Sequence, residues 1–443
     1  MDILNDIEKD NRTLDNILDD TLERKQLSDR RDRALLHALV FGILRWRGRL
    51  DYIINSFSRT RLNKIDPPVL NILRLGLFQM VYLNRIPVSA AVNTAVDLAK
   101  ASSPPWVIRY VNAVLRSAAR DQKNVRFPDY EQDPVAAIAA RKSLPQWLSR
   151  RWLEKAGKDK TVQHCDAINL IPPLTLRTNT LKTTRRNLLK ELAKEADTLR
   201  PTIYAPDGIT LLNPNKMIAD FPAFNKGWFQ VQDEAAQLVT LLLAPRPGDK
   251  VLDACAGLGG KTGHTAQLMN DQGSIVALDV YGAKLDRLEK QMQLMGVSIV
   301  DTRVHNLNIP PKKETLGTFD RILLDAPCSG LGVLRRNPDT RWKIRETMLK
   351  DYAEKQLRLL DNLSHLVNPS GILVYAVCST EPEENEAVAE KFLNRHLEFI
   401  KEDPPANLPK KIGVLLTRDG SLITSPHQHN MDGFYCVRFK RIQ

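Results

Sequence analysis

Two cysteine motifs contain the residues best suited to carry out chemistry. Cys328 lies in D-A-P-C-S-G and Cys378 lies in A-V-C-S-T, and each follows an apolar run and precedes a serine. A single cysteine in such a place is more often a small apolar core residue than a catalyst. Two cysteines in equivalent contexts, with Asp325 three residues before the first, favour a pair of reactive thiols.

Such a pair suits chemistry on a pyrimidine ring. A thiolate that adds to C6 of cytosine makes C5 electron-rich, so that C5 attacks the methyl group of a sulfonium donor. A base then removes the C5 proton and the thiolate leaves. A carboxyl group such as that of Asp325 stabilises the adduct if it hydrogen-bonds the N3/N4 edge of the base. We therefore expect one cysteine to attack and the other to assist release, provided that a methyl donor binds nearby.

A glycine-rich loop, D-A-C-A-G-L-G-G-K-T-G-H at residues 253–264, is the candidate donor site. It departs from the Walker A motif because Cys255 replaces the first glycine, and from the dinucleotide motif because Thr262 replaces the third. A strand, a glycine turn and a helix remain. Asp279, which lies 20 residues after Gly259, ends the next strand and is placed to accept hydrogen bonds from ribose hydroxyls. The layout predicts a nucleoside ligand such as S-adenosylmethionine; the alternative is a turn used only for packing.

The elements that position these motifs begin at about residue 232. Short apolar strands separated by helices indicate a mostly parallel sheet covered on both faces, and in such sheets ligands bind beyond the carboxyl ends of the strands. That edge would hold the loop, Asp279, Asp325 and both cysteines. The expected strands are residues 249–255, 274–280, 319–327 and 371–379.

The preceding residues show different patterns. Apolar residues recur at helical spacing up to about residue 120, which predicts an all-α bundle. Residues 121–135 are polar with two prolines, and residues 172–214 alternate between strand and basic helix patterns. We therefore expect three parts: an all-α domain (1–130), linker helices with a small α+β subdomain (131–232), and an α/β Rossmann-like catalytic domain (233–443).

Charge and cysteine content suggest the partner and the compartment. The net charge is +12, and residues 51–200 carry 25 Lys and Arg side chains against 13 Asp and Glu side chains. Such a local surplus indicates either a polyanion partner or a solvated basic face. The five cysteines are widely spaced, the N-terminus lacks a signal pattern, and no run of about 18 apolar residues occurs. We expect a cytoplasmic protein without a metal site.

Together the motifs resemble those of the Sun (Fmu, RsmB) family of RNA cytosine-C5 methyltransferases over nearly the whole chain. The family's cofactor loop reads C-A-A-P-G-G-K-T, and residues 255–262 read C-A-G-L-G-G-K-T. Residues 231–238, V-Q-D-E-A-A-Q-L, match the segment before its first strand. The resemblance implies that S-adenosylmethionine is bound by Cys255, Ala256, Gly257, Leu258, Gly259, Gly260, Lys261, Asp279, Asn306 and Asp325.

The resemblance also assigns roles. Cys378 would attack C6, Cys328 would assist release, and Asp325 would lie where the cofactor meets the base. Lys261 would either face the cofactor carboxylate or fix the loop. Gly257-Leu258 replaces the usual Ala-Pro, and Asn306 replaces an aspartate on the adenine side.

The N-terminal helices resemble the NusB-like RNA-binding domain of the family's ribosomal branch. This implies a monomer that methylates 16S ribosomal RNA, free or early in assembly, with Arg335 and Arg336 contacting RNA phosphates. The alternatives are the same chemistry on tRNA and a non-catalytic ribosome-assembly factor that binds RNA.

Overall fold

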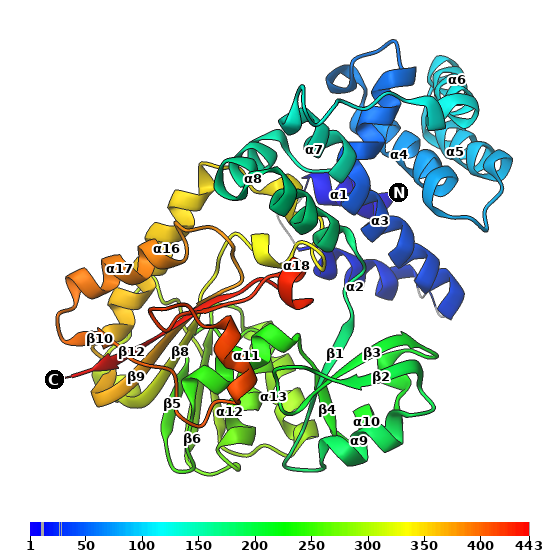
Figure 1. Ribbon diagram of the computed structural model, residues 1–443. Coiled ribbons are helices and arrows are strands. Elements are labelled where there is room, and N and C mark those ends of the chain that lie inside the picture. The colour runs from blue at the N-terminus through cyan, green and yellow to red at the C-terminus, as the bar shows by residue number, and fades with distance from the viewer. Residues whose placement is uncertain (10–12, 26, 28, 443) are drawn as a thin grey trace. The chain divides into compact units, whose positions relative to one another are not determined.

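The computed structural model describes residues 1–9, 13–25, 27 and 29–442. The chain divides into two compact units. The first, the helical unit, comprises Met1–Leu170 and Leu334–Glu346; the second, the α/β unit, comprises Ile171–Val333 and the chain from Thr347 onward. The helical N-terminal domain, the small α+β subdomain and the Rossmann-like domain that the sequence predicts are all confirmed (Figure 1).

The helical unit is built from amphipathic helices around one apolar core. The best-predicted helix, α4, begins at Pro67 and Pro68, because proline fits the first turn where no backbone donor is needed. Its core residues Leu73 and Leu77 have no exposed surface. The helices are α1 (Asp2–Lys9), α2 (Leu14–Lys25), α3 (Arg30–Phe57), α4 (Pro67–Tyr82), α5 (Val88–Ser102), α6 (Pro105–Asp121), α7 (Pro134–Lys142) and α8 (Gln146–Asn169).

The helical unit extends past the boundary expected at residue 130. Helix α7 packs on both α3 and α8, and this packing buries Ala137 and Ile138 completely. Leu148 and Trp152 of α8 are buried as well. Residues 134–169 therefore pack in the same compact unit as the N-terminal helices.

Residues 334–346, here called the inserted segment, also belong to the helical unit. Arg341, at the start of its short helix α15 (Thr340–Lys343), has no exposed surface. Its guanidinium donates to the Ser143 carbonyl at 3.2 Å and to Asn169 Oδ1 at 2.8 Å. The Trp342 indole donates to the Leu44 carbonyl at 2.7 Å.

Burial of this segment does not fit the phosphate contact expected of Arg335. The Arg335 side chain is 1% exposed, and its carbonyl accepts a hydrogen bond from Arg45 at 2.7 Å. The run of basic residues resembles a solvated RNA-binding loop in sequence, but long-range packing turns Arg335 and Arg341 inward. Arg336 is partly exposed.

The α/β unit begins with a small antiparallel sheet of order β2-β3-β1-β4. Its strands are β1 (Leu174–Thr178), β2 (Ala196–Pro201), β3 (Gly208–Pro214) and β4 (Phe229–Val231), with α9 (Arg185–Leu192) and α10 (Pro222–Asn225) beside them. Thr184 caps α9 by accepting from the Asn187 amide. Leu188 and Leu192 of that helix pack on Leu176 and Ile209 of the sheet. This is the basic α+β subdomain that the sequence predicts.

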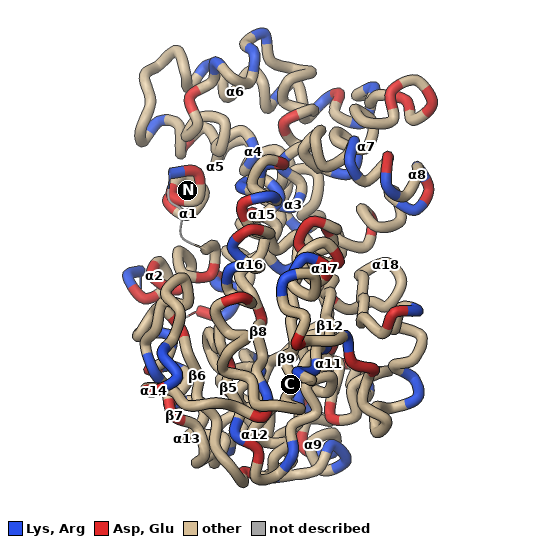
Figure 2. The backbone as a smooth tube through the Cα atoms, turned by 90° about the vertical axis from the view of Figure 1, so that its left-hand side faces the viewer, with Lys and Arg blue, Asp and Glu red and all other residues tan. Residues whose placement is uncertain are grey.

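The large sheet of the unit has the order β10-β12-β9-β8-β5-β6-β7, with β11 paired to β12 (Figures 1 and 2). Strands β9, β8, β5, β6 and β7 run parallel, whereas β12 and β10 are antiparallel. The strands are β5 (Lys250–Asp253), β6 (Ser274–Asp279), β7 (Val300–Val304), β8 (Phe319–Asp325), β9 (Val367–Val377), β10 (Phe399–Lys401), β11 (Leu422–Ile423) and β12 (Tyr435–Arg441).

Helices cover both faces of this sheet, as its continuous apolar strands require. One face packs against α11 (Glu234–Leu243), α12 (Gly260–Leu268) and α13 (Gly282–Met295). The other packs against α16 (Met348–Ser364) and α17 (Glu386–Arg395). Shorter helices are α14 (Lys313–Leu316) and α18 (Pro426–His429). The carboxyl ends of β5, β6, β8 and β9 therefore share one edge, which carries every predicted chemical motif.

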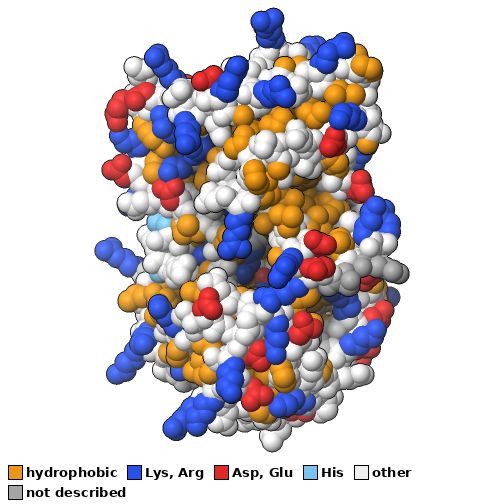
Figure 3. Space-filling model, turned by 90° about the vertical axis from the view of Figure 1, so that its right-hand side faces the viewer, with side chains coloured by type: hydrophobic (Ala, Val, Ile, Leu, Met, Phe, Trp, Pro, Cys, Tyr) orange, Lys and Arg blue, Asp and Glu red, His pale blue; other side chains and the backbone are white. Residues whose placement is uncertain are grey.

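The distribution of charged side chains on the surface does not mark a binding site as clearly as the motifs at the sheet edge do. On the face drawn in Figure 3, Lys and Arg side chains are scattered among acidic and uncharged ones. Within the part of the chain that the structure describes, no helix combines the length and the apolar composition needed to cross a membrane.

Candidate active site

The glycine-rich loop links β5 to α12 through a tight turn. Gly257 and Gly259 have φ values of 56° and 82°, in the left-handed region that favours glycine. A Cβ atom on Gly259 would lie 2.6 Å from Leu288 Cγ, so this position also needs a residue without a side chain. Leu258 is about half exposed. Where the family usually has Ala-Pro, this chain therefore has a glycine, Gly257, at a position with left-handed backbone, and a half-exposed leucine, Leu258, after it.

Asp279, at the end of β6, is fixed by backbone amides. Its Oδ2 accepts from the Gly257 amide at 3.1 Å, and its Oδ1 accepts from the Tyr281 amide at 2.9 Å. Lys284 Nζ lies 3.9 Å from the same carboxylate. The predicted ribose-binding carboxylate is thus held against the loop.

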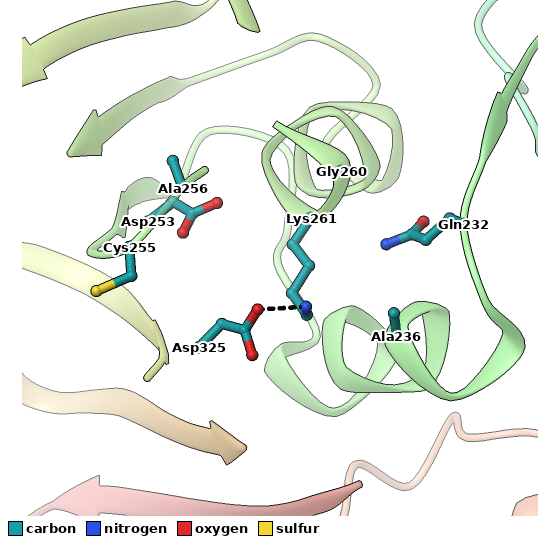
Figure 4. Close-up of a pocket in the computed structure, with 8 residues that line it drawn as sticks. All are labelled: Gln232, Ala236, Asp253, Cys255, Ala256, Gly260, Lys261 and Asp325. Atoms are coloured by element: carbon teal, nitrogen blue, oxygen red, sulfur yellow. Dashed lines mark hydrogen bonds and ion pairs between the residues drawn. The ribbon is translucent and has the colours of Figure 1, made fainter. Parts of the chain in front are cut away.

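A pocket opens beside the loop, at the ends of β5 and β8 (Figure 4). Within it Lys261 Nζ and Asp325 Oδ2 are 2.5 Å apart. Burial by itself would lower the pKa of Lys261, but the charge of Asp325 and the hydrogen bond to it raise the pKa. The pocket is lined by Gln232, Ala236, Asp253, Cys255, Ala256, Gly260, Lys261 and Asp325.

Asp253 lines this pocket and is 2% exposed. Its Oδ2 accepts from the Thr262 hydroxyl at 2.7 Å. Burial raises the pKa of Asp253 to about 6, against the opposing effect of the Thr262 hydrogen bond. The carboxyl is therefore ionised at neutral pH at a cost in free energy.

The two predicted cysteines meet at the same edge of the sheet. Cys328 Sγ, from the loop after β8, lies 3.2 Å from Cys378 Sγ, just beyond β9. The hydrogen bond to Cys378 and burial raise the pKa of Cys328. The raised pKa keeps Cys328 as a thiol beside Cys378. The charge of Cys378 also helps to raise the pKa of Lys261.

Three family models match parts of the chain. Residues 240–440 match the family described as 16S rRNA methyltransferase RsmB/F, and residues 1–120 match the NusB family. Residues 144–218 match a ferredoxin-like domain of RsmF/B-like methyltransferases.

Individual relatives resemble the chain over nearly its full length. It is 36% identical to a probable ribosomal RNA small subunit methyltransferase B of Synechocystis sp., over 99% of this chain and 98% of the relative. It is 35% identical to ribosomal RNA small subunit methyltransferase B of Pseudomonas syringae pv. tomato, over 93% of this chain and 90% of the relative. The crystal structure of PH0851 superposes with a TM-score of 0.81 at 26% identity, over 97% of this chain and 94% of that one.

The chain belongs to the RsmB/F family of methyltransferases. S-adenosylmethionine is its cofactor. The residues present fit that molecule: a glycine turn permits close approach of the backbone, and Asp279 offers oxygen acceptors to ribose hydroxyls. When bound, the cofactor supplies an electrophilic methyl group.

The cysteine pair of this RsmB/F chain is held by a buried carboxylate that sequence reasoning missed. Glu384 has no exposed surface and accepts hydrogen bonds from residues next to both cysteines. Its Oε2 accepts from the Ser329 amide at 2.8 Å and from Gln356 Nε2 at 2.9 Å. Its Oε1 accepts from the hydroxyls of Ser329 and of Ser379, the latter at 2.6 Å. Glu384 thus ties the turn after Cys328 to the turn after Cys378.

The predicted catalytic and cofactor-binding residues gather at this edge, and Asn306 follows β7 there, because Val304 pairs with Asp279. The Asn306 side chain accepts from the Asn308 amide at 3.1 Å, is exposed, and is not among the residues that line the pocket. Gln232 and Ala236 line the pocket but were not predicted to do so. Their position in the family-matching stretch of residues 231–238 was the available signal.

Proposed function

We propose that this protein methylates C5 of a cytosine in 16S ribosomal RNA through a covalent adduct between Cys378 and C6. The observation that carries the proposal is the approach of two thiols to 3.2 Å at a sheet edge where Asp325 also lines the cofactor pocket. A methyltransferase acting on an oxygen or an exocyclic nitrogen has no need of two adjacent thiols. Attack at an unactivated pyrimidine carbon does need a nucleophile.

The proposed steps assign each electron pair. The Cys378 thiolate adds to C6, and the displaced π electrons make C5 nucleophilic. C5 then takes the methyl group, and the bonding pair stays with the donor sulfur. A base removes the C5 proton, the C5–C6 double bond reforms, and the sulfur–C6 bond breaks to release Cys378. Cys328, held as a thiol beside Cys378, assists this last step by giving a proton to the departing sulfur.

Asp325 and Lys261 support the base and the cofactor. One oxygen of Asp325 is held by Lys261 at 2.5 Å, and we propose that the other meets the pyrimidine N3/N4 edge. Lys261 fixes the carboxylate and places a positive charge near Cys378. For cofactor binding we propose the loop residues from Cys255 to Lys261 together with Asp279 and Asp325. A contact of Asn306 with adenine and a contact of Arg336 with RNA remain predictions.

The substrate assignment rests on the relatives. They are named ribosomal RNA small subunit methyltransferases, and residues 1–120 match the NusB family. The target cytosine must be unpaired or flipped out, because C6 is shielded within a stacked duplex. We further propose a monomer that acts in the cytoplasm on RNA that is free or early in assembly.

The test compares the two cysteines. Cys378→Ala should abolish methyl transfer from labelled S-adenosylmethionine, whereas Cys328→Ala should accumulate a denaturation-resistant protein–RNA adduct. Cys165→Ala, which removes a buried thiol of the helical unit, is the control and should retain methyl transfer. Normal turnover by Cys378→Ala would refute the covalent assignment.

A second measurement identifies the substrate. Bisulfite mapping should reveal one new 5-methylcytosine in protein-free 16S RNA and a weaker signal in assembled small subunits. Methylation of bulk tRNA, without methylation of 16S RNA, would show that tRNA is the substrate and would refute the assignment to ribosomal RNA. RNA affinity should fall steeply with salt, because phosphate contacts release counterions.

A further inference from the structure

Gln232 occupies a junction between the small sheet and the cofactor pocket. It follows β4 directly, and its backbone amide donates to the Thr175 carbonyl of β1 at 3.0 Å. Its side chain is 7% exposed and lines the pocket that contains Lys261 and Asp325. Gln232 is therefore a fixed part of the pocket wall.

The orientation of the Gln232 amide is set by a fully buried arginine. Arg177 of β1 has no exposed surface, and its Nη1 donates to Gln232 Oε1 and, at 2.6 Å, to the Gly260 carbonyl. Its Nη2 donates to Gln230 Oε1 at 2.9 Å. A guanidinium group has donors and no acceptor, so it must face the amide oxygen and not the amide nitrogen.

The Gln232 Nε2 group is consequently turned into the pocket. Figure 4 shows this nitrogen pointing from the strand side toward Lys261. Nε2 is buried and has no hydrogen-bond partner among the described residues. A buried donor without a partner is costly, and one aimed into a ligand pocket indicates an acceptor on the ligand.

A complementary group faces the same pocket. Asp253 Oδ1 is buried and accepts no hydrogen bond from the part of the chain that the structure describes. The pocket wall thus presents one unused donor and one unused acceptor, both rigidly held. An α-amino acid in its zwitterionic form offers the matching carboxylate and ammonium groups.

The place of this pocket in the sheet fits the amino-acid end of the cofactor. Asp279 lies at the end of β6, and Asp325 lies at the end of β8, with the β5 loop between them. A ribose at Asp279 therefore directs the rest of the molecule across the loop toward β8. Lys261 uses one of its three donors on Asp325, whereas Gln232 Nε2 has no partner among the described residues and can donate to a carboxylate.

We propose that Gln232 binds the cofactor: its Nε2 donates to the carboxylate of the amino-acid end, while Asp253 accepts from the ammonium group. Arg177 is the positioning residue that fixes the amide and the start of α12 together. The small sheet thereby contributes directly to recognition of the methyl donor.

The experiment measures binding and requires no turnover. Isothermal titration gives the Kd of S-adenosylhomocysteine, which has the amino-acid end, and of 5′-methylthioadenosine, which lacks it. Gln232→Met should weaken S-adenosylhomocysteine by about 10-fold or more and leave 5′-methylthioadenosine unchanged. Gln232→Glu keeps an acceptor for Arg177 but presents a negative charge to the carboxylate, so it should weaken S-adenosylhomocysteine further.

Gln230→Met is the matched control. It removes another partner of Arg177 but does not line the pocket, so both Kd values should stay within about twofold of the wild-type values. An equal loss for both ligands in Gln232→Met would overturn the proposal in favour of a disordered loop. So would an unchanged Kd for S-adenosylhomocysteine, or an equal loss in Gln230→Met. Thermal unfolding of each variant identifies any that fails to fold, and the Glu variant then carries the test.

Discussion

Two buried polar groups of the α/β unit differ in how completely the protein satisfies them. Both oxygens of Glu384 are used, each accepting two hydrogen bonds from neighbouring side chains or backbone. Gln232 has its oxygen paired with Arg177, but its nitrogen has no partner among the described residues. A saturated group holds parts of the protein together, and an unsaturated one in a pocket awaits a ligand.

The difference corresponds to the two tasks of the site. In the proposed mechanism, the cysteine turns keep one arrangement while bonds form and break, and their carboxylate frame is complete without substrate. The proposed cofactor contacts form and break in each cycle, and the pocket wall keeps a donor and an acceptor for them. Variants that alter one kind of group should therefore affect stability and turnover, and variants of the other kind should affect binding.

The largest effect is expected for Glu384→Gln. The nitrogen of the new amide would face either the Ser329 amide and Gln356 Nε2, which donate, or the hydroxyls of Ser329 and Ser379, which would have to turn and accept. In both orientations the buried frame loses hydrogen bonds to a charged acceptor. We expect the free energy of unfolding to fall by about 3 to 5 kcal/mol and kcat by about 100-fold or more, with cofactor Kd nearly unchanged. Chemical denaturation measures the unfolding free energy, steady-state methylation measures kcat, and isothermal titration measures the cofactor Kd.

Glu390→Gln is the control for this change, since Glu390 is exposed on α17. It should shift stability by less than about 0.5 kcal/mol. If Glu384→Gln retains wild-type kcat in the folded fraction, Glu384 stabilises the fold without positioning the thiols.

Gly332→Ala should have the next largest effect. The Gly332 amide donates to the Cys378 carbonyl at 3.0 Å, and a Cβ atom there would lie 2.0 Å from the Gly433 carbonyl oxygen. The Cys378 turn is therefore also held from a second side, where no added atom fits. We expect a loss of about 2 to 3 kcal/mol in unfolding free energy, measured by denaturant titration.

Gly413→Ala is the control for this change, because it adds the same methyl group at a position where no other atom is close. An added Cβ at Gly413 meets no atom within 4 Å, so stability should change by less than about 0.5 kcal/mol. Equal losses in the two variants would contradict the steric explanation.

The sequence predicts which residues meet at this edge of the sheet because strand ends are local features. An apolar run followed by Asp253, Asp279, Asp325 or Cys378 indicates a strand and its last residue, and parallel strands bring those ends together. The order of the strands and the antiparallel pairing of β12 were not predicted, because they depend on long-range pairing.

The supporting residues could not be recognised from sequence for the same physical reason. Glu384 lies in the acidic run E-P-E-E-N-E, which resembles a solvated helix start, and Arg335 lies in a basic run. Both side chains are buried, and residues distant in the sequence contact them: Ser329 and Gln356 contact Glu384, and Arg45 contacts the Arg335 backbone. Gln232 belongs to a motif that indicated the family but gave no role until Arg177 was seen to orient its amide.

Asp253→Asn should change stability and cofactor binding in opposite directions, by less than the two preceding variants change stability. The folded-state pKa of Asp253 is raised to about 6 from 3.8, so the folded protein holds this proton more tightly than the unfolded chain. Stability contributed by that proton is present below about pH 4 and is lost as pH rises through about 6. The amide removes this cost, so unfolding free energy should rise by about 1 to 3 kcal/mol at pH 8 and little at pH 4.

The same variant should weaken S-adenosylhomocysteine, because an amide cannot offer a charge to the ammonium group. Asp286→Asn, on the exposed face of α13, is the control and should alter neither quantity. A stability gain that is the same at both pH values would contradict a buried, ionised Asp253.

The smallest effect is expected at the surface, where a polar pair neither holds the site nor awaits a ligand. Lys350 and Glu354 are one turn apart on α16, with their charged atoms 3.8 Å apart and side chains 83% and 65% exposed. Water solvates both partners whether or not they meet, so Lys350→Ala should change unfolding free energy by less than about 0.5 kcal/mol and leave methylation unchanged. Lys261→Ala removes a cation that is 12% exposed and leaves the Asp325 carboxylate without its partner, so it should reduce methylation strongly. Equal effects of the two alanine variants on methylation would mean that burial does not distinguish structural from functional pairs in this protein.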